Sequence, residues 1–252
     1  MPRKEQPVTE SSVTIKDDRF YFVDGEYYPR CTWILNYYPK GEGFARWLGA
    51  AASFEDAERI KNEAAARGTK VHQACAELVA GKKLSIADYS SSEWQMIKSF
   101  VAWNEEAQPQ FLASELFVVS KEIEVAGTLD LLCLIDGKKG VVDIKISSAI
   151  YASHFLQISF YAKAYCEQTK DAGEVETAIL RLGSKHRCGY EYVKEKKPWL
   201  ESFDDFLAVK RIFHNENPKL IPNIKIEPTT LCLTNQKTNQ KLKSPSPKDG
   251  KK

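Results

Sequence analysis

Two aspartates and a lysine lie on two adjoining stretches whose composition favours a β-hairpin. Gly127-Thr-Leu-Asp130 opens an apolar run, Asp136-Gly137 is a turn dipeptide, and Val141-Val-Asp143-Ile-Lys145 ends the second run. A two-residue type I′ turn here pairs residues whose numbers sum to 273, which sets Asp130 opposite Asp143. A longer loop would shift the register by about one residue and keep the acids near each other. We therefore expect both carboxylates within reach of one divalent cation.

Asp143 and Lys145 share one face of the second run, because side chains alternate along a strand. Burying two carboxylates and a lysine among apolar neighbours is costly unless a cation or hydrogen bonds compensate. A hard metal ion would provide that compensation. A salt bridge between Lys145 and either acid is the alternative, and any α/β protein can contain one.

The remaining elements must position these groups. Phe54 to Gly81 has helical composition, and within it Gly68, a candidate kink or break, lies four residues before His72 on one face. We expect the other elements to be a helix at 92–108, a strand at 112–119 that carries Glu115, a helix at 151–169 that carries Gln157 and Tyr161 on one face, a strand at 176–182 and a helix at 199–215. This order predicts an α/β sandwich with a small mixed sheet flanked by helices.

Composition limits the class of protein. The 252 residues fit one elaborated domain or two, and the sequence shows neither an apolar run of membrane-spanning length nor a signal-peptide core. The cysteines show no Cys-x-x-Cys spacing, so we expect reduced thiols rather than a zinc site. The formal net charge of +2 is uneven, since Thr234 to Lys252 holds six Lys and one Asp. Any nucleic-acid contact of the remaining chain must therefore be a local groove.

Basic and aromatic residues also occur together near the N-terminus. Arg30, Arg46 and Trp47 follow a second hairpin signal around Asp24-Gly25. These residues either pack as a lid on the core or contact a nucleic-acid strand through their charge and aromatic stacking.

Taken in order, these features resemble the PD-(D/E)XK nuclease superfamily, in particular its RecB-like branch, which includes the mitochondrial genome maintenance exonuclease. The resemblance covers about Pro29 to Arg187. It rests on a helical Gly-x-x-x-His, a strand glutamate, Gly-x-x-Asp, Asp-x-Lys and a Gln-x-x-x-Tyr on the following helix. Thr-x-Ile-Leu at Thr32 and Phe-x-x-Trp at Phe44 are also similar to phage exonucleases.

The resemblance implies a role for each motif residue. Asp130, Asp143 and Lys145 would be catalytic, and Lys145 would orient or deprotonate the attacking water. One or two Mg²⁺ or Mn²⁺ ions would be bound by His72, Asp130, Asp143 and the Ile144 carbonyl. Residues expected around that site are Glu115, either beside the metal ligands or as the partner of a basic residue, Gln157 and Tyr161 as supports that contact the scissile strand, and Arg67, Lys185 and Arg187 as DNA contacts.

From composition we expect a flexible N-terminus at 1–12 and an irregular arm with a disordered Lys-rich tail at 217–252. The resemblance implies that a PD-(D/E)XK nuclease domain with an N-terminal elaboration lies between them, at 13–216. Ile146 departs from many relatives, which have Thr there. The cysteine cluster of the CRISPR adaptation nucleases is missing from the sequence, so we expect no iron–sulfur cluster. No Gly-x-x-x-x-Gly-Lys-Ser/Thr motif is present, so a helicase, a single-strand-binding protein or a recombination protein is the expected partner for unwinding.

The sequence thus predicts a metal-dependent DNA nuclease. We expect an exonuclease that hydrolyses single-stranded DNA or DNA ends in recombination, repair or replication. Its expected location is the cytoplasm, bacterial or phage-infected, rather than the mitochondrial matrix, with no membrane partner. A structure-specific endonuclease, a catalytically silent nucleic-acid-binding protein of the same fold and an unrelated α/β enzyme remain as alternatives. Strand polarity, DNA versus RNA preference and oligomeric state are left open.

Overall fold

The computed structural model describes residues 12–15, 17–170, 175–183, 185 and 188–228. Asp18–Pro222 form one unit, and the described chain before and after it belongs to a second. In the second unit, β1 (Ser12–Ile15) pairs antiparallel with β9 (Lys225–Pro228).

The sheet of β1 and β9 joins the two ends of the described chain, and the domain boundaries expected from the sequence stay predictions. The strand β9 lies in the segment 217–252, which we expected to be irregular, and β1 groups with this strand although the expected domain begins at residue 13. The physical reason is that each strand satisfies the backbone hydrogen-bonding groups of the other. The flexible terminus and the disordered tail predicted for 1–11 and 229–252 lie outside the described residues.

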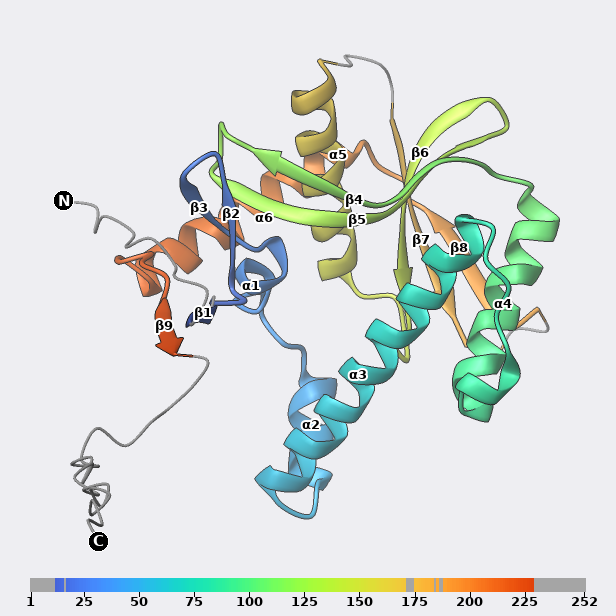
Figure 1. Ribbon diagram of the computed structural model, residues 1–252, viewed down its shortest axis with the longest axis horizontal. Helices are drawn as coiled ribbons and strands as arrows, with labels where there is room; N and C mark the ends of the chain where they lie inside the picture. Colours follow the sequence, from blue (N-terminus) through green and yellow to red (C-terminus); the bar gives the residue numbers. More distant parts are fainter. Residues whose placement is uncertain (1–11, 16, 171–174, 184, 186–187, 229–252) are drawn as a thin grey trace, which may run out of the picture. The chain divides into compact units, whose positions relative to one another are not determined.

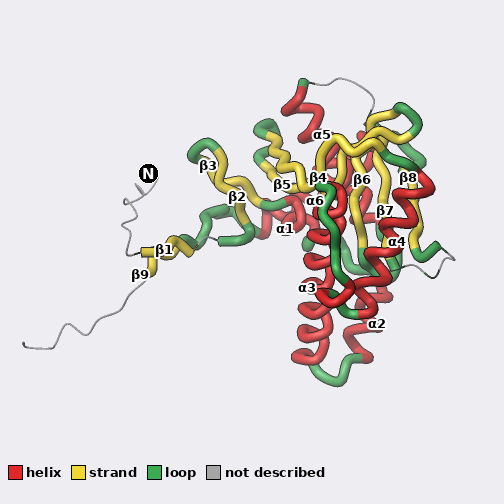
Figure 2. The backbone as a smooth tube through the Cα atoms, turned by 45° about the vertical axis from the view of Figure 1, so that its right-hand side comes forward, coloured by secondary structure: helices red, strands yellow, loops and turns green. Residues whose placement is uncertain are grey.

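The larger unit is built on a mixed five-stranded sheet in the order β4-β5-β6-β7-β8. The strands are β4 (Gln110–Ser120), β5 (Val125–Ile135), β6 (Lys138–Lys145), β7 (Glu176–Leu182) and β8 (Tyr190–Lys194). Only the β6–β7 pair is parallel among these neighbours, and α5 (Ala152–Thr169) makes the crossover between them. Helices cover both faces of the sheet (Figures 1 and 2). The predicted α/β sandwich with a small mixed sheet is confirmed.

The hairpin between β5 and β6 has the predicted register. In every pair, from Ile135–Lys138 to Leu131–Val142, the residue numbers sum to 273. The turn residues Asp136 and Gly137 have φ angles of 52° and 76°, the left-handed values that a type I′ turn requires. Pairing stops one step before Asp130 and Asp143, which therefore lie at the end of the ladder.

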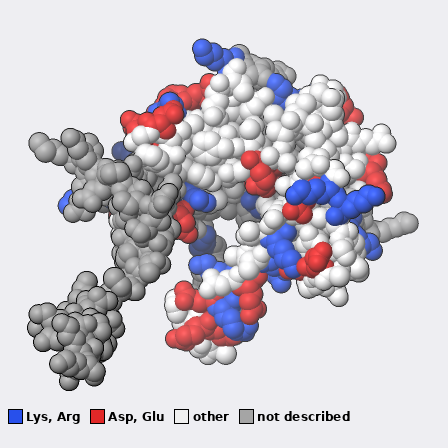
Figure 3. Space-filling model, viewed as in Figure 1, with Lys and Arg blue, Asp and Glu red and all other residues white. Residues whose placement is uncertain are grey.

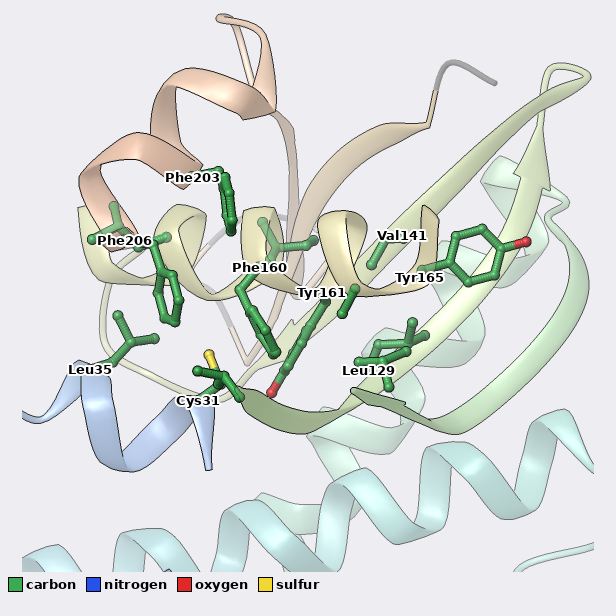
Figure 4. Packing of buried hydrophobic residues seen from close by; sticks show 14 of the residues in the cluster. Cys31, Leu35, Leu129, Val141, Phe160, Tyr161, Tyr165, Phe203 and Phe206 are labelled. Atoms are coloured by element: carbon green, nitrogen blue, oxygen red, sulfur yellow. The ribbon is translucent and has the colours of Figure 1, made fainter. Parts of the chain in front are cut away.

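Two apolar layers hold the sheet between the helices. On one face, Val71 of α3 (Phe54–Val79) and Trp103 of α4 (Ser91–Ala107) pack with Val142 and Ile144. On the other, α1 (Cys31–Leu35), α5 and α6 (Trp199–Glu216) pack against the sheet, with Phe160 and Phe206 stacked at the centre (Figure 4). The sheet is thus buried on both sides, so polar groups on its strands need specific partners.

Helix α3 runs without interruption from Phe54 to Val79. Ser53 accepts a hydrogen bond from the Asp56 amide at its start, where acidic residues also favour the helix dipole. A break at Gly68, one of the two possibilities that the sequence suggested, does not occur. Gly68 lies inside the helix with open space where a Cβ would stand, because tertiary packing on either side outweighs its weak helix propensity.

Shorter elements complete the larger unit. They are the hairpin strands β2 (Phe20–Val23) and β3 (Glu26–Pro29), the helix α2 (Glu42–Ala50) and the 3₁₀ turn η1 (Ile86–Asp88). On the face drawn in Figure 3, Lys and Arg side chains are interspersed with Asp and Glu. Of the helices that the structure describes, none combines the length and apolar character needed to span a membrane.

Candidate active site

A groove of about 960 Å³ lies between α3 and the part of the sheet that carries Asp130 of β5 and Lys145 of β6. Its walls also include Tyr21 of β2 and Arg30, which lies between β3 and α1. Six of the residues expected to bind metal, catalyse or support the site line it: His72, Glu115, Asp130, Lys145, Gln157 and Tyr161. The fold therefore collects side chains from α3, β4, β5, β6 and α5 around one concave surface.

Three of these side chains form a potential metal site. The ligand atoms of His72, Glu115 and Asp130 lie within 4.8 Å of one another. His72 Nδ1 is 3.3 Å from Asp130 Oδ1. One imidazole nitrogen and two carboxylates are a donor set that suits a divalent ion such as Mn²⁺ or Mg²⁺.

Glu115 reaches this cluster from an irregular point of β4. Its neighbours Ser114 and Leu116 pair with Leu131 and Leu129, so Glu115 falls opposite Asp130. Its φ angle is 51°, an uncommon conformation for a residue with a side chain, and it costs on the order of 1 to 3 kcal/mol. The sequence prediction placed Glu115 beside the expected metal ligands, and in the structure its carboxylate lies within 4.8 Å of the potential ligand atoms of His72 and Asp130.

Asp130 is fixed by the strand that follows the turn. Its Oδ2 accepts a hydrogen bond from the Ile144 amide at 2.6 Å, where the backbone pairing of β5 with β6 has just ended. The carboxylate thus takes the place of a backbone acceptor and leaves Oδ1 toward His72. The structure shows this amide contact of Ile144, whereas the resemblance concerned its carbonyl.

Asp143 is the most deeply buried of the acids, with 1% of its side chain exposed. Its Oδ2 lies 2.6 Å from Lys145 Nζ, so the salt bridge considered as an alternative is present. The other oxygen, Oδ1, is buried and has no hydrogen-bond or ion-pair partner among the described residues. A buried carboxylate oxygen without a partner is costly, and a cation would satisfy it. The residues present therefore fit a bound metal ion.

Lys145 is held by a short chain of polar groups from α5. Its Nζ donates to Gln157 Oε1 at 3.0 Å, and Gln157 Nε2 donates to Tyr161 Oη at 2.9 Å. Because Gln157 and Tyr161 are four residues apart, both lie on the face of α5 that lines the groove. In Figure 4, Tyr161 extends from α5 toward Cys31.

The Gly-x-x-Asp motif does not by itself explain why residue 127 is a glycine. A Cβ at this position would lie 2.5 Å from Tyr161 Cε1, closer than real contacts allow. The glycine of Gly-x-x-Asp therefore permits the tyrosine ring to pack on β5 beside the site. The motif marked the position, but the packing partner is distant in sequence.

Electrostatics separate the two aspartates. Burial would raise the pKa of Asp130, but the charge and hydrogen bond of His72 outweigh it and lower that pKa. Burial raises the pKa of Asp143, with the charge of Lys145 opposing. Burial would lower the pKa values of His72 and Lys145, but neighbouring carboxylates raise both. Lys145 is therefore a cation next to Asp143.

The other predicted contacts are distributed around this site. Arg67 and Lys185 line a separate cavity, and Arg187 lies outside the described residues. Arg30 lines the groove with its guanidinium 4.3 Å from the Tyr21 ring centroid.

The exposed helix α2 carries the other basic and aromatic pair. Arg46 pairs with Glu42 at 3.0 Å, and Trp47 is 37% exposed. Helix α2 has no buried residue, so the core-lid interpretation does not hold for it.

No family model and no curated protein matches the sequence. Among solved structures, the chain is similar to a protein from Eubacterium rectale named "Putative exonuclease", at 12% identity over 73% of this chain and 77% of that one, with a TM-score of 0.41. It is also similar to SSO0001, at 12% identity over 46% of this chain and 55% of that one, with a TM-score of 0.28. The fold is an α/β sandwich, and the functional argument rests on the side chains of its groove.

Proposed function

We propose that the protein is a metal-dependent nuclease of the PD-(D/E)XK type that hydrolyses phosphodiester bonds of DNA. The observation that supports this best is that His72, Glu115 and Asp130 meet within 4.8 Å, beside the end of β6, the strand that carries Asp143 and Lys145. Acidic ligands, a histidine and a strand lysine in one groove are the groups that metal-assisted attack on a phosphate requires.

The ligands proposed for Mg²⁺ or Mn²⁺ are His72, Asp130 and Asp143, with Glu115 as an additional carboxylate. Asp143 supplies an oxygen that lacks a hydrogen-bond partner, and Asp130 is oriented by the Ile144 amide. When bound, a divalent ion would lower the pKa of a water molecule and neutralise negative charge on the phosphate.

The protein's own residues would do the remaining work. Lys145, as a cation held by Gln157, lies where it can orient a water molecule and stabilise negative charge on a phosphate oxygen. Tyr161 fixes Gln157 and thereby the position of the ammonium group. Arg30 and Tyr21 offer a charged group and an aromatic ring along the groove wall for the strand itself.

Among nucleases, we propose an exonuclease that acts on single strands or DNA ends in recombination, repair or replication, with a helicase or single-strand-binding protein as partner. The exonuclease assignment comes from the sequence resemblance. A structure-specific endonuclease and a silent nucleic-acid-binding protein are the competing assignments within this fold.

Digestion of matched linear and circular single-stranded DNA separates these assignments. The wild type is tested with Mn²⁺, Mg²⁺ or EDTA, beside Asp143→Ala and the control Asp204→Ala, which changes an exposed residue of α6. We expect cleavage of the linear form only, lost with EDTA and in Asp143→Ala but kept in Asp204→Ala. Cleavage of both forms would indicate an endonuclease. Binding without cleavage, with duplex also tested, would contradict the proposal.

A further inference from the structure

A second cavity, of about 790 Å³, lies next to the groove along two shared elements. On α3, Arg67 lines the second cavity and Gly68 lines the groove. On the β6 side, Ile146 lines the second cavity and Lys145 lines the groove. Adjacent residues therefore separate the two spaces, and a ligand in one is close to a ligand in the other.

Arg67 is unusual among the arginines of α3. Its Nε is buried and has no hydrogen-bond partner, and no carboxylate of the described residues forms an ion pair with it. Arg59, on the same helix, pairs with Asp56 at 2.6 Å and with Glu63 at 2.7 Å. A buried guanidinium donor without a partner is unfavourable, so Arg67 favours an anionic ligand in its cavity.

The rest of the cavity wall is also positively charged. Arg181 is neutralised by Glu191 at 2.7 Å, whereas Lys185 forms no ion pair with a described residue. Arg67 and Lys185 thus leave two positive charges without compensation. Met96 and Leu182 add apolar surface to the same wall, beside these cations.

We propose that this second cavity binds a phosphate group of the nucleic-acid strand, next to the phosphate held in the groove, with Arg67 as its main ligand. The planar guanidinium suits two phosphate oxygens, and Lys185 supplies a second charge. The apolar wall suits the attached nucleoside, which a free inorganic anion lacks. This inference rests on the proposed nuclease function and extends it by defining where the strand continues.

Direct observation of Arg67 tests anion binding without any catalysis. The Nε–H NMR signal of Arg67, assigned with Arg67→Lys, is followed during titration with inorganic phosphate and then with a single-stranded oligonucleotide, in EDTA. We expect both ligands to shift the Arg67 signal and to leave the Arg59 signal unchanged. An Arg67 signal that neither ligand moves would overturn the inference.

Affinity measurements then distinguish a strand phosphate from a free anion. Arg67→Gln is compared with Arg59→Gln by fluorescence anisotropy of a single-stranded oligonucleotide in EDTA, after thermal denaturation confirms that both variants fold. We expect Arg67→Gln to weaken binding about tenfold and to reduce the salt slope by about 0.7, the value for one lost contact to a single strand. Arg59→Gln should match the wild type.

The outcomes separate the two proposals. A shifted Arg67 signal with phosphate but unchanged oligonucleotide affinity in Arg67→Gln would make this a free-anion site and overturn the strand assignment. Loss of oligonucleotide affinity in Arg67→Gln, together with absence of hydrolysis by the wild type, would support strand binding in the second cavity and contradict the proposed nuclease function. Normal hydrolysis by the wild type, together with an Arg67 signal that no ligand shifts and an unaltered oligonucleotide affinity of Arg67→Gln, would contradict phosphate binding in the second cavity but not the nuclease function.

Discussion

At the scale of single residues, the site depends on how a few carboxylates are buried. Asp143 is enclosed with one oxygen near Lys145 and the other without a partner, while Asp130 is anchored by a backbone amide. Burial of this kind is unfavourable for an isolated charge. The arrangement is explained if a cation completes it, and this gives a residue-level test.

Replacement of Asp130 by Asn should uncouple His72 from the site. The charge and hydrogen bond of Asp130 raise the pKa of His72 against the effect of burial, so that pKa should fall in Asp130→Asn. Histidine NMR titration of the metal-free protein measures this change. Mn²⁺ affinity and hydrolysis should also decrease, the latter at least ~100-fold, or about 2.7 kcal/mol of barrier.

A control for this substitution is His214, on α6, whose pKa is lowered chiefly by burial and should not respond. If the pKa of His72 stayed the same in Asp130→Asn while that of His214 was also unchanged, the contact between His72 and Asp130 would not exist in solution.

Two glycine substitutions should have opposite effects on stability. In Gly127→Ala the new Cβ would overlap the Tyr161 ring, so the variant should lose on the order of 1 to 3 kcal/mol from overpacking. In Gly68→Ala the Cβ meets open space inside α3, so stability should rise by roughly 0.5 to 1 kcal/mol. Urea denaturation measures both. Equal changes in the two variants would contradict the packing of Tyr161 on Gly127.

At the scale of elements, the sequence predicted most of the site because its parts are local. The turn Asp136-Gly137 determines the hairpin register, and the spacing of Gln157 and Tyr161 determines their shared helical face. The position of Glu115 was harder to predict, since it depends on a register shift between Phe111 and Ala113 and a left-handed residue in β4. Irregular backbone of this kind leaves no periodic signal in a sequence.

Other features depend on residues distant in sequence. The pairing of β1 with β9 joins segments about 210 residues apart, and short strands far from each other have no hairpin signal. The packing of Tyr161 on Gly127 and the lack of a hydrogen-bond partner for the buried Arg67 Nε likewise follow from tertiary structure. The sequence singled out Gly127, Tyr161 and Arg67, but it showed neither their surroundings nor the pairing of β1 with β9.

The start of α5 should give the stability of the protein a pH dependence. Burial, assisted by the charge of Lys145, lowers the pKa of His154 to about 3, and its Nδ1 accepts a hydrogen bond from the Tyr151 amide. Because the folded-state pKa lies below the unfolded value of about 6.5, stability is fully present above pH 6.5 and is lost as the pH falls toward 3. At pH 5 the loss amounts to at most ~2 kcal/mol.

The variant His154→Asn isolates this effect, because an amide oxygen can accept the same hydrogen bond without titrating. We expect the free energy of unfolding of the wild type, measured in urea, to fall more steeply between pH 7 and pH 5 than that of His154→Asn. Parallel curves would show that His154 titrates alike in the folded and unfolded states.

At the scale of the whole molecule, a site of acidic ligands makes folding stability depend on divalent ions. Asp130 lies close to Glu115, and its negative charge, in addition to burial, raises the pKa of both Glu115 and Asp143. Ionisation of one carboxyl group therefore disfavours ionisation of its neighbours. An ion that binds only the folded state should add about 2.7 kcal/mol when its concentration is 100 times its Kd. For a domain of this size, that corresponds to a rise in Tm of roughly 5 to 11 °C.

Differential scanning fluorimetry of EDTA-treated protein with added Mn²⁺ measures this rise. Asp130→Asn should lose most of it, and NaCl at matched ionic strength should not reproduce it. A Tm that Mn²⁺ leaves unchanged in the wild type would argue against a metal site of useful affinity.

The type I′ turn between β5 and β6 also has a consequence for the order of folding. A hairpin closed by two residues forms within about 1 to 10 μs, whereas contacts between distant segments form later because they require larger loops to close. Asp130 and Asp143 should therefore meet early, before His72 arrives with α3. During unfolding the sequence of events reverses, so the departure of α3 should open the cluster while the hairpin persists.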